Sequence, residues 1–233
     1  MKIFNKGFNF AQDGPGNRLV YHLQGCNMHC IWCSNPEGIN TAGGKDYTLD
    51  EIIDVCKRSK MMFFPNGGVT FTGGEATVQF AELLELLKSL KAENIHTCIE
   101  TNGTHPRLSE LLLYIDYLIM DFKHYDNELH KKYTGIGNET VKQNFERNCE
   151  TKRQQHIRIP LINGINTEYP EGFAEYFSKF DTENTVFEFL SYHEYGKEKW
   201  TEEYKVKDGF VDDKTINRFK EAFVKHGLNL IRT

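Results

Sequence analysis

The chain has 233 residues, of which 26% are charged and 13% aromatic, and its formal net charge is −5. This length suffices for one large α/β domain or two small ones, and the aromatic content can supply a sizeable core. A mildly acidic chain lacks the broad basic field on which nonspecific nucleic-acid binding depends. The sequence has no run of about 18 apolar residues, so we expect no membrane span. We therefore expect neither nucleic acid nor membrane among its partners.

The N-terminal stretch MKIFNKGFNFAQDGPGN lacks the uninterrupted apolar core and the small-residue cleavage site of a signal peptide. This favours a cytoplasmic protein. Six cysteines in a chain of this length indicate reduced thiols or metal ligands rather than a disulfide framework. Three of them lie in apolar or helical contexts, where we expect small buried side chains: Cys56, Cys98 and Cys149.

Apolar runs typical of strands alternate with amphipathic helical patterns along the chain. In chain order, the patterns predict a strand at 18–24, a helix at 49–60, a strand at 68–73, a helix at 80–93, a strand at 96–101, a helix at 109–115, a strand at 117–122, a helix within 139–152, a strand at 156–162, a helix at 172–180, a strand at 185–191, a helix within 214–226 and a short final stretch at 228–232. Six strands with intervening helices imply parallel pairing through βαβ crossovers. We therefore expect an α/β fold, a partial (β/α)6 TIM-like barrel of mostly parallel strands, as a single domain over 1–233. In such folds, reactive groups collect where strands end and helices begin.

The stretch QGCNMHCIWCSNPEG, residues 24–38, holds Cys26, Cys30 and Cys33 directly after a predicted strand. A structural zinc site closes with four protein ligands, and an ordinary iron–sulfur cluster also takes four cysteines. Three thiolates would leave one metal position open for a substrate or a cofactor. The alternative is a zinc site that His22 or His29 completes.

The spacing Cys-x3-Cys-x2-Cys, with Trp32 before the last cysteine, resembles the cluster loop of radical S-adenosylmethionine (radical SAM) enzymes. Six further stretches resemble pyruvate formate-lyase activases and related glycyl-radical activases: DGPGNR (13–18), TGGEAT (72–77), HTCIETNG (96–103), MDFKH (120–124), RIPLINGIN (158–166) and SYHEYGKEKW (191–200). The resemblance covers nearly the whole chain. It implies a barrel of the radical SAM type.

The resemblance also implies a [4Fe–4S] cluster on Cys26, Cys30 and Cys33, which would chelate S-adenosylmethionine through its open iron. In the chemistry that the resemblance implies, one electron entering the sulfonium would break the S–C5′ bond, and the resulting 5′-deoxyadenosyl radical would abstract a hydrogen from the substrate. The cofactors supply this step, while the protein positions the reactants and excludes competitors. An electron donor such as flavodoxin or ferredoxin is implied as a partner.

By resemblance, seven residues contact S-adenosylmethionine: Gly73, Gly74, Glu75, Lys123, Arg158, His193 and Asn35. The two glycines allow a close backbone approach that a side chain would block, and Glu75 would lie beside the ammonium group. Lys123 and His193 each follow an apolar strand, which favours function over a solvated surface position. Asn35 would bind the adenine end; because it precedes Pro36, a turn residue is the alternative.

Three features depart from the activase pattern. Many activases with WCSNPE after the cluster loop carry a ferredoxin-like insert with further cysteines, whereas Gly73 lies only forty positions after Cys33 here. Activases without the insert usually have a different sequence where this chain has SNPEG. The third departure is Glu100, which with Thr101 and Asp121 matches a monovalent-cation site of the activases but replaces their usual aspartate.

This combination resembles the queuine lyases, radical SAM enzymes that cleave queuine and release 7-aminomethyl-7-deazaguanine for queuosine salvage. We therefore expect a small-molecule substrate, the deazapurine base queuine. The alternative is a glycyl-radical enzyme as the partner, in which the radical abstracts hydrogen from a backbone glycine.

The queuine hypothesis needs a carboxylate that accepts the N–H groups of a guanine-like base and an acid–base group for the departing amine. Glu51, in the first turn of the first predicted helix, is the candidate carboxylate; Thr48-x-x-Glu51 also matches a capping box. Lys199, after the last strand, is the candidate catalytic acid–base group, and Lys197 is its rival. For both lysines the alternative is an exposed position in a charged run. Trp200 either walls the pocket or lies half-buried in the core.

Overall fold

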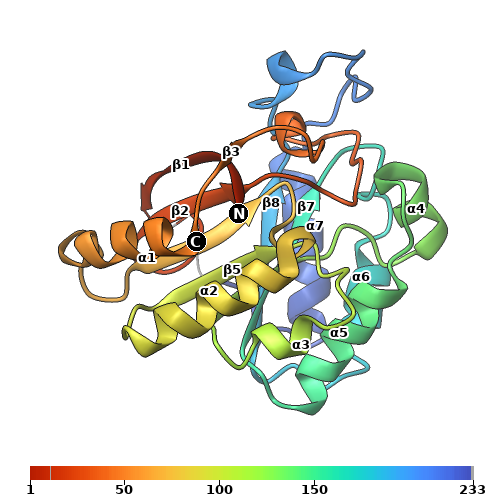
Figure 1. Cartoon of the computed structure of the whole chain (residues 1–233). Coiled ribbons are helices and arrows are strands. Elements are labelled where there is room, and N and C mark those ends of the chain that lie inside the picture. Colours follow the sequence, from red (N-terminus) through yellow and green to blue (C-terminus); the bar gives the residue numbers. More distant parts are fainter. Residues whose placement is uncertain (11, 232–233) are drawn as a thin grey trace. The chain divides into compact units, whose positions relative to one another are not determined.

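The computed structural model describes residues 1–10 and 12–231 (Figure 1). Its strands form one eight-stranded sheet in the order β3-β1-β2-β4-β5-β6-β7-β8, with ends at β3 and β8. The bounds are β1 Lys2–Phe10, β2 Asn17–Leu23, β3 Lys45–Asp46, β4 Gly68–Gly73, β5 Thr97–Thr101, β6 Tyr117–Asp121, β7 Gln155–Leu161 and β8 Thr185–Ser191. The sheet is thus open rather than a closed barrel.

Seven α-helices and four short 3-10 helices are present among the described residues. The α-helices are α1 Leu49–Arg58, α2 Phe80–Ala92, α3 Leu108–Leu111, α4 Asn127–Thr134, α5 Glu139–Glu150, α6 Pro170–Phe177 and α7 Asp213–Lys225. The 3-10 helices are η1 Pro36–Gly38, η2 Lys60–Met62, η3 Ala76–Gln79 and η4 Lys197–Lys199.

The expected α/β fold with mostly parallel strands is confirmed, and all six predicted strands are present as β2 and β4 to β8. Parallel pairing joins β2 to β4, β4 to β5 and β7 to β8. The sequence patterns missed β1 and β3, which pair antiparallel at one edge of the sheet. Much of β1 is exposed, so it lacks the apolar run that marks the other strands. The final predicted stretch forms only a bridge at Leu230, and its residue 232 lies outside the described residues.

The chain divides into two compact units. The first comprises residues 1–27, 35–101 and 105–119, and the second comprises 28–34, 102–104 and the chain from 120 onward. The single domain expected over 1–233 stays a prediction.

In the first unit, α1 and α2 lie side by side along the strands β2, β4 and β5 (Figure 1). The core beneath them includes Val69, Phe71 and Ile99, all fully buried. The rings of Tyr21 and Phe71 stack with their centroids 5.7 Å apart. Burial of a side chain such as Phe71 contributes about 1.5–3 kcal/mol, so these contacts stabilise the strands that carry the site residues.

In the second unit, aromatic side chains form most of the core. The ring centroid of Phe177 in α6 lies 4.7 Å from Phe122 and 4.7 Å from Phe187 in β8. Phe223 of α7 meets Phe187 edge to face at 5.2 Å. Edge-to-face pairs of this kind add about 0.5–1.5 kcal/mol beyond burial, so α6 and α7 are firmly attached to β8.

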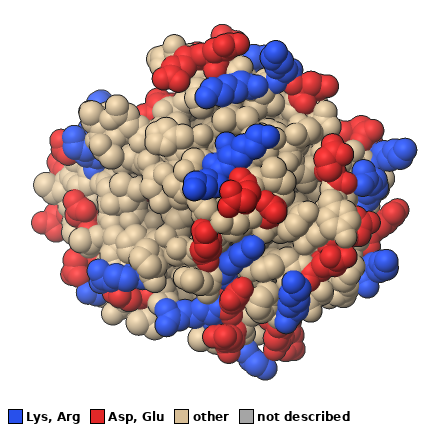
Figure 2. Space-filling model, turned by 90° about the vertical axis from the view of Figure 1, so that its right-hand side faces the viewer, with Lys and Arg blue, Asp and Glu red and all other residues tan. Residues whose placement is uncertain are grey.

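The described residues include no helix that is both long and apolar enough to cross a membrane. On the face in Figure 2, basic and acidic side chains are interspersed, with wide areas of neither kind. This face therefore shows no broad field of a single sign.

Candidate active site

In the first unit, the chain leaves β2 and passes directly into Cys26. Main-chain bonds hold this passage: Gly25 N–H donates to Gly38 O at 2.8 Å, and Cys26 N–H donates to Ile39 O at 3.0 Å. Gly38 is the last residue of η1, and Ile39 directly follows it. The helix η1 begins directly after Asn35. The side chain of Asn35 is half-buried and makes no cap hydrogen bond to η1.

The glycine motif at the end of β4 packs against the same passage. Gly73 has φ +130°, and a Cβ there would lie 2.2 Å from Leu23 N. A Cβ on Gly74 would lie 2.3 Å from Gly38 O and 2.4 Å from Gly25 O. Both positions therefore require glycine, because the backbone before Cys26 approaches them too closely for a side chain.

Glu75 is buried, with 2% of its surface exposed. Its Oε1 accepts hydrogen bonds from Thr77 N–H at 2.8 Å and from Thr101 Oγ1 at 2.7 Å. Thr77 Oγ1 also donates to this oxygen. The carboxylate thus caps η3 and ties it to β5, a structural task that its sequence motif does not reveal.

Glu51 completes the capping box of α1. Its Oε2 accepts from Thr48 N–H at 2.8 Å, and Thr48 Oγ1 accepts from Glu51 N–H at 3.2 Å. The capping box that the sequence offered as the structural role of Glu51 is therefore present. A substrate contact for this exposed carboxylate stays a prediction.

The cation-site residues lie at the ends of two strands, Glu100 and Thr101 in β5 and Asp121 in β6. Thr101 is buried and its hydroxyl donates to Glu75. The monovalent cation itself stays a prediction.

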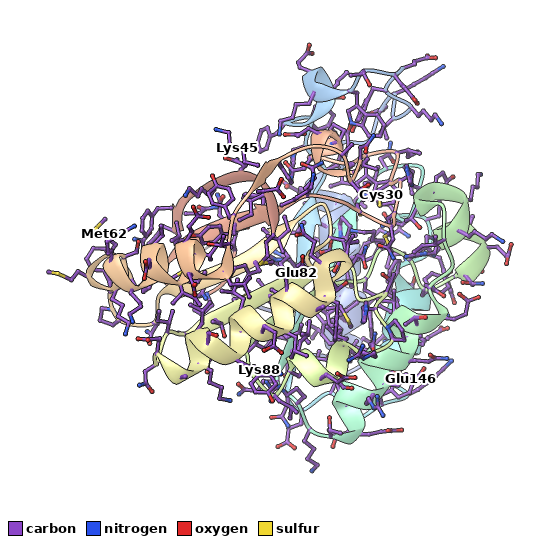
Figure 3. All side chains as sticks on the ribbon, in the orientation of Figure 1. Cys30, Lys45, Met62, Glu82, Lys88 and Glu146 are labelled. Carbon is purple, nitrogen blue, oxygen red and sulfur yellow. The ribbon has the colours of Figure 1, made fainter. Side chains whose placement is uncertain are left out.

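In the second unit, the loop with Cys30 and Cys33 is held at its start by the last turn of α4. His29 N–H donates to Thr134 O at 2.7 Å, and Ile31 N–H donates to Tyr133 O at 3.2 Å. Within the loop, Cys33 N–H donates to Cys30 O at 3.0 Å. Cys30, labelled in Figure 3, is buried, whereas Cys33 is half-buried.

Lys123 follows β6, as the sequence predicted. Its Nζ donates to Asp121 Oδ2 at 2.7 Å, and the two side chains are 11% and 24% exposed. The solvated surface alternative is thus wrong for this lysine. Within the second unit its ammonium is held by the carboxylate that was predicted as a cation ligand.

Arg158 in β7 lies directly across from Glu188 in β8, and Arg158 Nε donates to Glu188 Oε2 at 2.8 Å. His156 Nε2 lies 3.0 Å from the same oxygen. Burial acts to raise the pKa of Glu188, but the hydrogen bond from His156 and the charge of Arg158 outweigh it and hold that pKa below its ordinary value. An ion pair of Arg158 with Glu188, with His156 beside it, therefore lies at the position where the sequence predicted a cofactor contact.

His193 lies just beyond β8 and is half-buried. Its ring stacks on Tyr195 with centroids 4.2 Å apart, and Tyr195 N–H lies 3.4 Å from its Nδ1. Burial lowers the pKa of His193, which favours the neutral imidazole.

Lys199 and Trp200 lie against the cysteine loop. Lys199 Nζ donates to Ser34 O at 3.3 Å, and Trp200 Nε1 donates to Cys33 O at 3.0 Å. Lys197 instead pairs with Glu194 at 2.9 Å. Of the two lysines proposed from the sequence, Lys199 is thus the one in contact with the loop.

None of the six cysteines forms a disulfide, and Cys56, Cys98 and Cys149 are buried as predicted. Burial raises the pKa of Cys56 to about 12 and that of Cys149 to about 11, so both remain thiols. Among the described residues, no group of three or more His, Cys, Asp or Glu side chains is arranged to hold a metal ion. Three thiols on one loop fit a cluster, because each cysteine there binds a different iron.

Comparison with known proteins identifies the family. Residues 20–177 match the sequence model of the radical SAM superfamily. The pyruvate formate-lyase 1-activating enzyme of Escherichia coli (strain K12) is 33% identical over 228 residues, covering 92% of each chain. The 4-hydroxyphenylacetate decarboxylase activating enzyme of Clostridioides difficile (strain 630) is 28% identical, covering 97% of this chain and 94% of that one. That alignment spans 297 positions, more than the length of this chain, so the relative carries residues that this chain lacks.

Two solved structures share the fold. A domain of a pyruvate-formate lyase-activating enzyme from Bacteroides vulgatus ATCC 8482 has a TM-score of 0.60 at 24% identity and covers 70% of this chain and 97% of that one. Streptococcus suis SuiB bound to the precursor peptide SuiA has a TM-score of 0.69 at 18% identity, covering 91% of this chain and 47% of SuiB.

The chain belongs to the radical SAM superfamily. Its curated relatives above are glycyl-radical activating enzymes, and the family implies a [4Fe–4S] cluster and S-adenosylmethionine as cofactors. The sequence-based expectation of both cofactors is thereby confirmed.

Two parts of the site were missed from the sequence. The helix α4 lacks a clear apolar periodicity, so the partner of His29 and Ile31 was not foreseen. Glu188 interrupts the apolar strand β8, just as Arg158 interrupts β7. A charge inside an apolar strand usually needs a buried partner, and that signal could have paired the two residues.

Proposed function

We propose that this radical SAM enzyme binds its cluster through Cys26, Cys30 and Cys33 and generates a 5′-deoxyadenosyl radical that abstracts hydrogen from a glycine of a partner glycyl-radical enzyme. The observation that carries the choice of substrate is the 33% identity to a pyruvate formate-lyase activating enzyme over 92% of both chains. These relatives therefore favour activation of a glycyl-radical enzyme, the alternative considered from the sequence, over queuine cleavage.

The bound cofactors supply the radical, and the chain supplies the binding groups. Gly73, Gly74 and Glu75 would meet the amino-acid part of S-adenosylmethionine, and Asn35 its adenine. In support, the tight backbone packing of the two glycines fixes the position of the β4 end relative to the passage before Cys26. By the resemblance, Lys123, Arg158 and His193 would supply further contacts, and Lys123 and Arg158 are each held by a carboxylate.

A second candidate function is the cleavage of queuine to 7-aminomethyl-7-deazaguanine. The observation that favours it is the contact of Lys199 Nζ with Ser34 O, because it sets an amine beside the cysteine loop. Such an amine can serve as the acid–base group for a departing amine. The missing insert and Glu100 also favour this candidate, with Glu51 as the carboxylate that would accept N–H groups of the base.

The substrate is tested by incubating the reduced, cluster-loaded enzyme with each candidate. With a glycyl-radical enzyme from the same organism, activation predicts a glycyl radical signal in electron paramagnetic resonance and 5′-deoxyadenosine in equal amount. With queuine, lyase activity predicts a product with the mass of 7-aminomethyl-7-deazaguanine. A product from queuine together with no glycyl radical would overturn the activase proposal.

Lys199→Ala distinguishes the two candidates further. If Lys199 is the acid–base group of a lyase, the variant should lose turnover by about 100-fold or more while still binding S-adenosylmethionine. Lys197→Ala is the matched control, because this lysine lies in the same short helix but pairs with Glu194. Full lyase activity of Lys199→Ala would refute the role.

A further inference from the structure

The segment that follows β8 contacts the cysteine loop at three points, all within the second unit. Trp200 Nε1 donates to Cys33 O at 3.0 Å, and Lys199 Nζ donates to Ser34 O at 3.3 Å. Gly196 packs on the backbone of Ser34 so closely that a Cβ there would lie 2.5 Å from Ser34 Cα. We call residues 196–200 the clamp segment.

The two side-chain donors, Lys199 and Trp200, differ in how firmly they hold the cysteine loop. The side chain of Lys199 is exposed, so its bond to Ser34 competes with water. Trp200 is half-buried, and its ring meets Tyr204 edge to face at 5.7 Å. An indole N–H is a donor only, and the aromatic contact fixes the direction in which it points.

The base of the clamp segment is itself braced. Tyr204 and Tyr192 share a hydrogen bond of 2.9 Å between their hydroxyls, and Tyr192 is buried in a small apolar cluster with Ile162 and Val206. Lys197 pairs with Glu194 at the start of the segment. The indole of Trp200 is therefore attached to the body of the second unit, not to a loose end.

Trp32 and Ile31 of the cysteine loop pack on that same apolar cluster. The loop is thus held at its start by the carbonyl groups of α4 and at its end by the clamp segment. Only the second attachment involves the residue that carries the third thiol of the motif.

We propose that Trp200 is a positioning residue for Cys33: its indole N–H fixes the Cys33 carbonyl and thereby sets the direction of the Cys33 thiol for the cluster. This inference rests on the proposed role of the three cysteines. It gives Trp200 a role beyond the two considered from the sequence, a pocket wall and a half-buried core residue, because the indole would hold a cluster ligand in place.

The test uses the apo protein first, so that no cofactor is needed. Trp200→Phe keeps an aromatic ring, smaller than indole, and removes the N–H. The alkylation rate of each cysteine is followed by peptide mass spectrometry with N-ethylmaleimide. We expect the Cys33 rate to rise about fivefold, the factor that the loss of one net hydrogen bond allows. Cys26 is an internal control, because main-chain bonds in the other unit hold it. An unchanged Cys33 rate would overturn the inference.

Gly196→Ala is a second, independent variant. Its φ of −94° suits any residue, so alanine acts only through its Cβ against Ser34. It should raise the Cys33 rate as Trp200→Phe does. Glu203→Gln is the matched control in the same region, since this side chain is exposed. A rise in Glu203→Gln equal to that in Trp200→Phe would show general loosening and would contradict the inference.

The reconstituted enzyme provides the readout that separates this inference from the proposed function. Trp200→Phe should still bind iron but should shift the reduction potential of the cluster and its electron paramagnetic resonance spectrum. If Cys33→Ala abolishes the cluster while Trp200→Phe leaves both the potential and the spectrum unchanged, the cysteine assignment stands and the inference fails. If Cys33→Ala retains the cluster, the proposed function fails.

Discussion

The chain around Cys26 is held by main-chain hydrogen bonds and by glycines, whereas the chain around Cys33 is held by side-chain donors from a distant segment. In the first unit, Gly73 and Gly74 pack flat against the backbone that leads into Cys26. In the second unit, Trp200 and Lys199 reach the loop through their side chains. A framework of main-chain contacts tolerates few substitutions, while a side-chain donor can be removed without disturbing the packing of the backbone.

The largest expected effect tests the main-chain framework of the first unit. Gly73→Ala should reduce the free energy of unfolding by on the order of 3–5 kcal/mol, because it combines a left-handed φ with a Cβ that overlaps Leu23. Urea unfolding followed by circular dichroism measures this change. Gly7→Ala is the control, since nothing lies within 4 Å of a Cβ there. A loss below about 1 kcal/mol in Gly73→Ala would mean that the packing at this position is loose.

A pH dependence tests the second unit. His124 is buried, and its Nδ1 accepts a hydrogen bond from Asp126 N–H at 2.9 Å, so the neutral ring fits this place. Burial lowers the pKa of His124 to about 4. Folding therefore disfavours protonation of His124, whose ordinary pKa is 6.5. The unfolding free energy that this histidine contributes is fully present above pH 6.5 and is lost as the pH falls toward 4.

By pH 5 this loss should reach about 2 kcal/mol relative to pH 7. The His124→Asn variant keeps an acceptor near the Nδ1 position but does not titrate, so it should lack this component. Urea unfolding of both proteins at pH 7 and pH 5 measures the difference. If both proteins lose the same unfolding free energy between pH 7 and pH 5, the assignment of a neutral, buried imidazole is contradicted.

Glu75 offers a side-chain exception within the first unit. Because its Oε1 accepts from three donors on Thr77 and Thr101, Glu75→Gln should cost about 1.5 kcal/mol of unfolding free energy through the weaker acceptor. Glu82→Gln, an exposed change in α2, serves as the control. Titration with S-adenosylmethionine then reports any separate contact with the ammonium group. A fully stable Glu75→Gln protein would show that the cap is dispensable.

The smallest effect concerns Glu51, whose two roles can be separated. Glu51→Ala should lose about 1 kcal/mol, because it removes one half of the capping box. Glu51→Gln keeps a capping-box residue and removes the charge, so stability should be retained. If Glu51 also accepts N–H groups of a substrate base, Glu51→Gln will raise the KM for that substrate. Unchanged KM and stability in Glu51→Gln would leave Glu51 as a helix cap alone.

The parts of the fold that the sequence predicts are those with a strong local pattern. The six parallel strands are apolar runs, and the capping box of α1 is legible in Thr48 and Glu51. The strand β1 and the helix α4 are mostly polar, so no periodicity marks them. Their formation depends on long-range pairing with β2 and with the cysteine loop.

The same distinction applies to the site. The cysteine spacing and the glycine motif are local signals, and they led to the family. The ion pair of Arg158 with Glu188 joins residues thirty positions apart, and the bond from Trp200 to Cys33 spans 167 positions. A single sequence carries no periodic signal for contacts of this kind, so the partners of Arg158 and Cys33 had to come from the structure.

We propose that three of the six cysteines serve radical chemistry and that the other three serve packing. The most direct measurement is the yield of 5′-deoxyadenosine from S-adenosylmethionine after anaerobic reconstitution and reduction. The Cys26, Cys30, Cys33 triple alanine variant should give none and should lack the brown absorbance of a cluster. The Cys56, Cys98, Cys149 triple alanine variant should retain both. Formation of 5′-deoxyadenosine by the first variant at the rate of the unchanged protein would contradict the account.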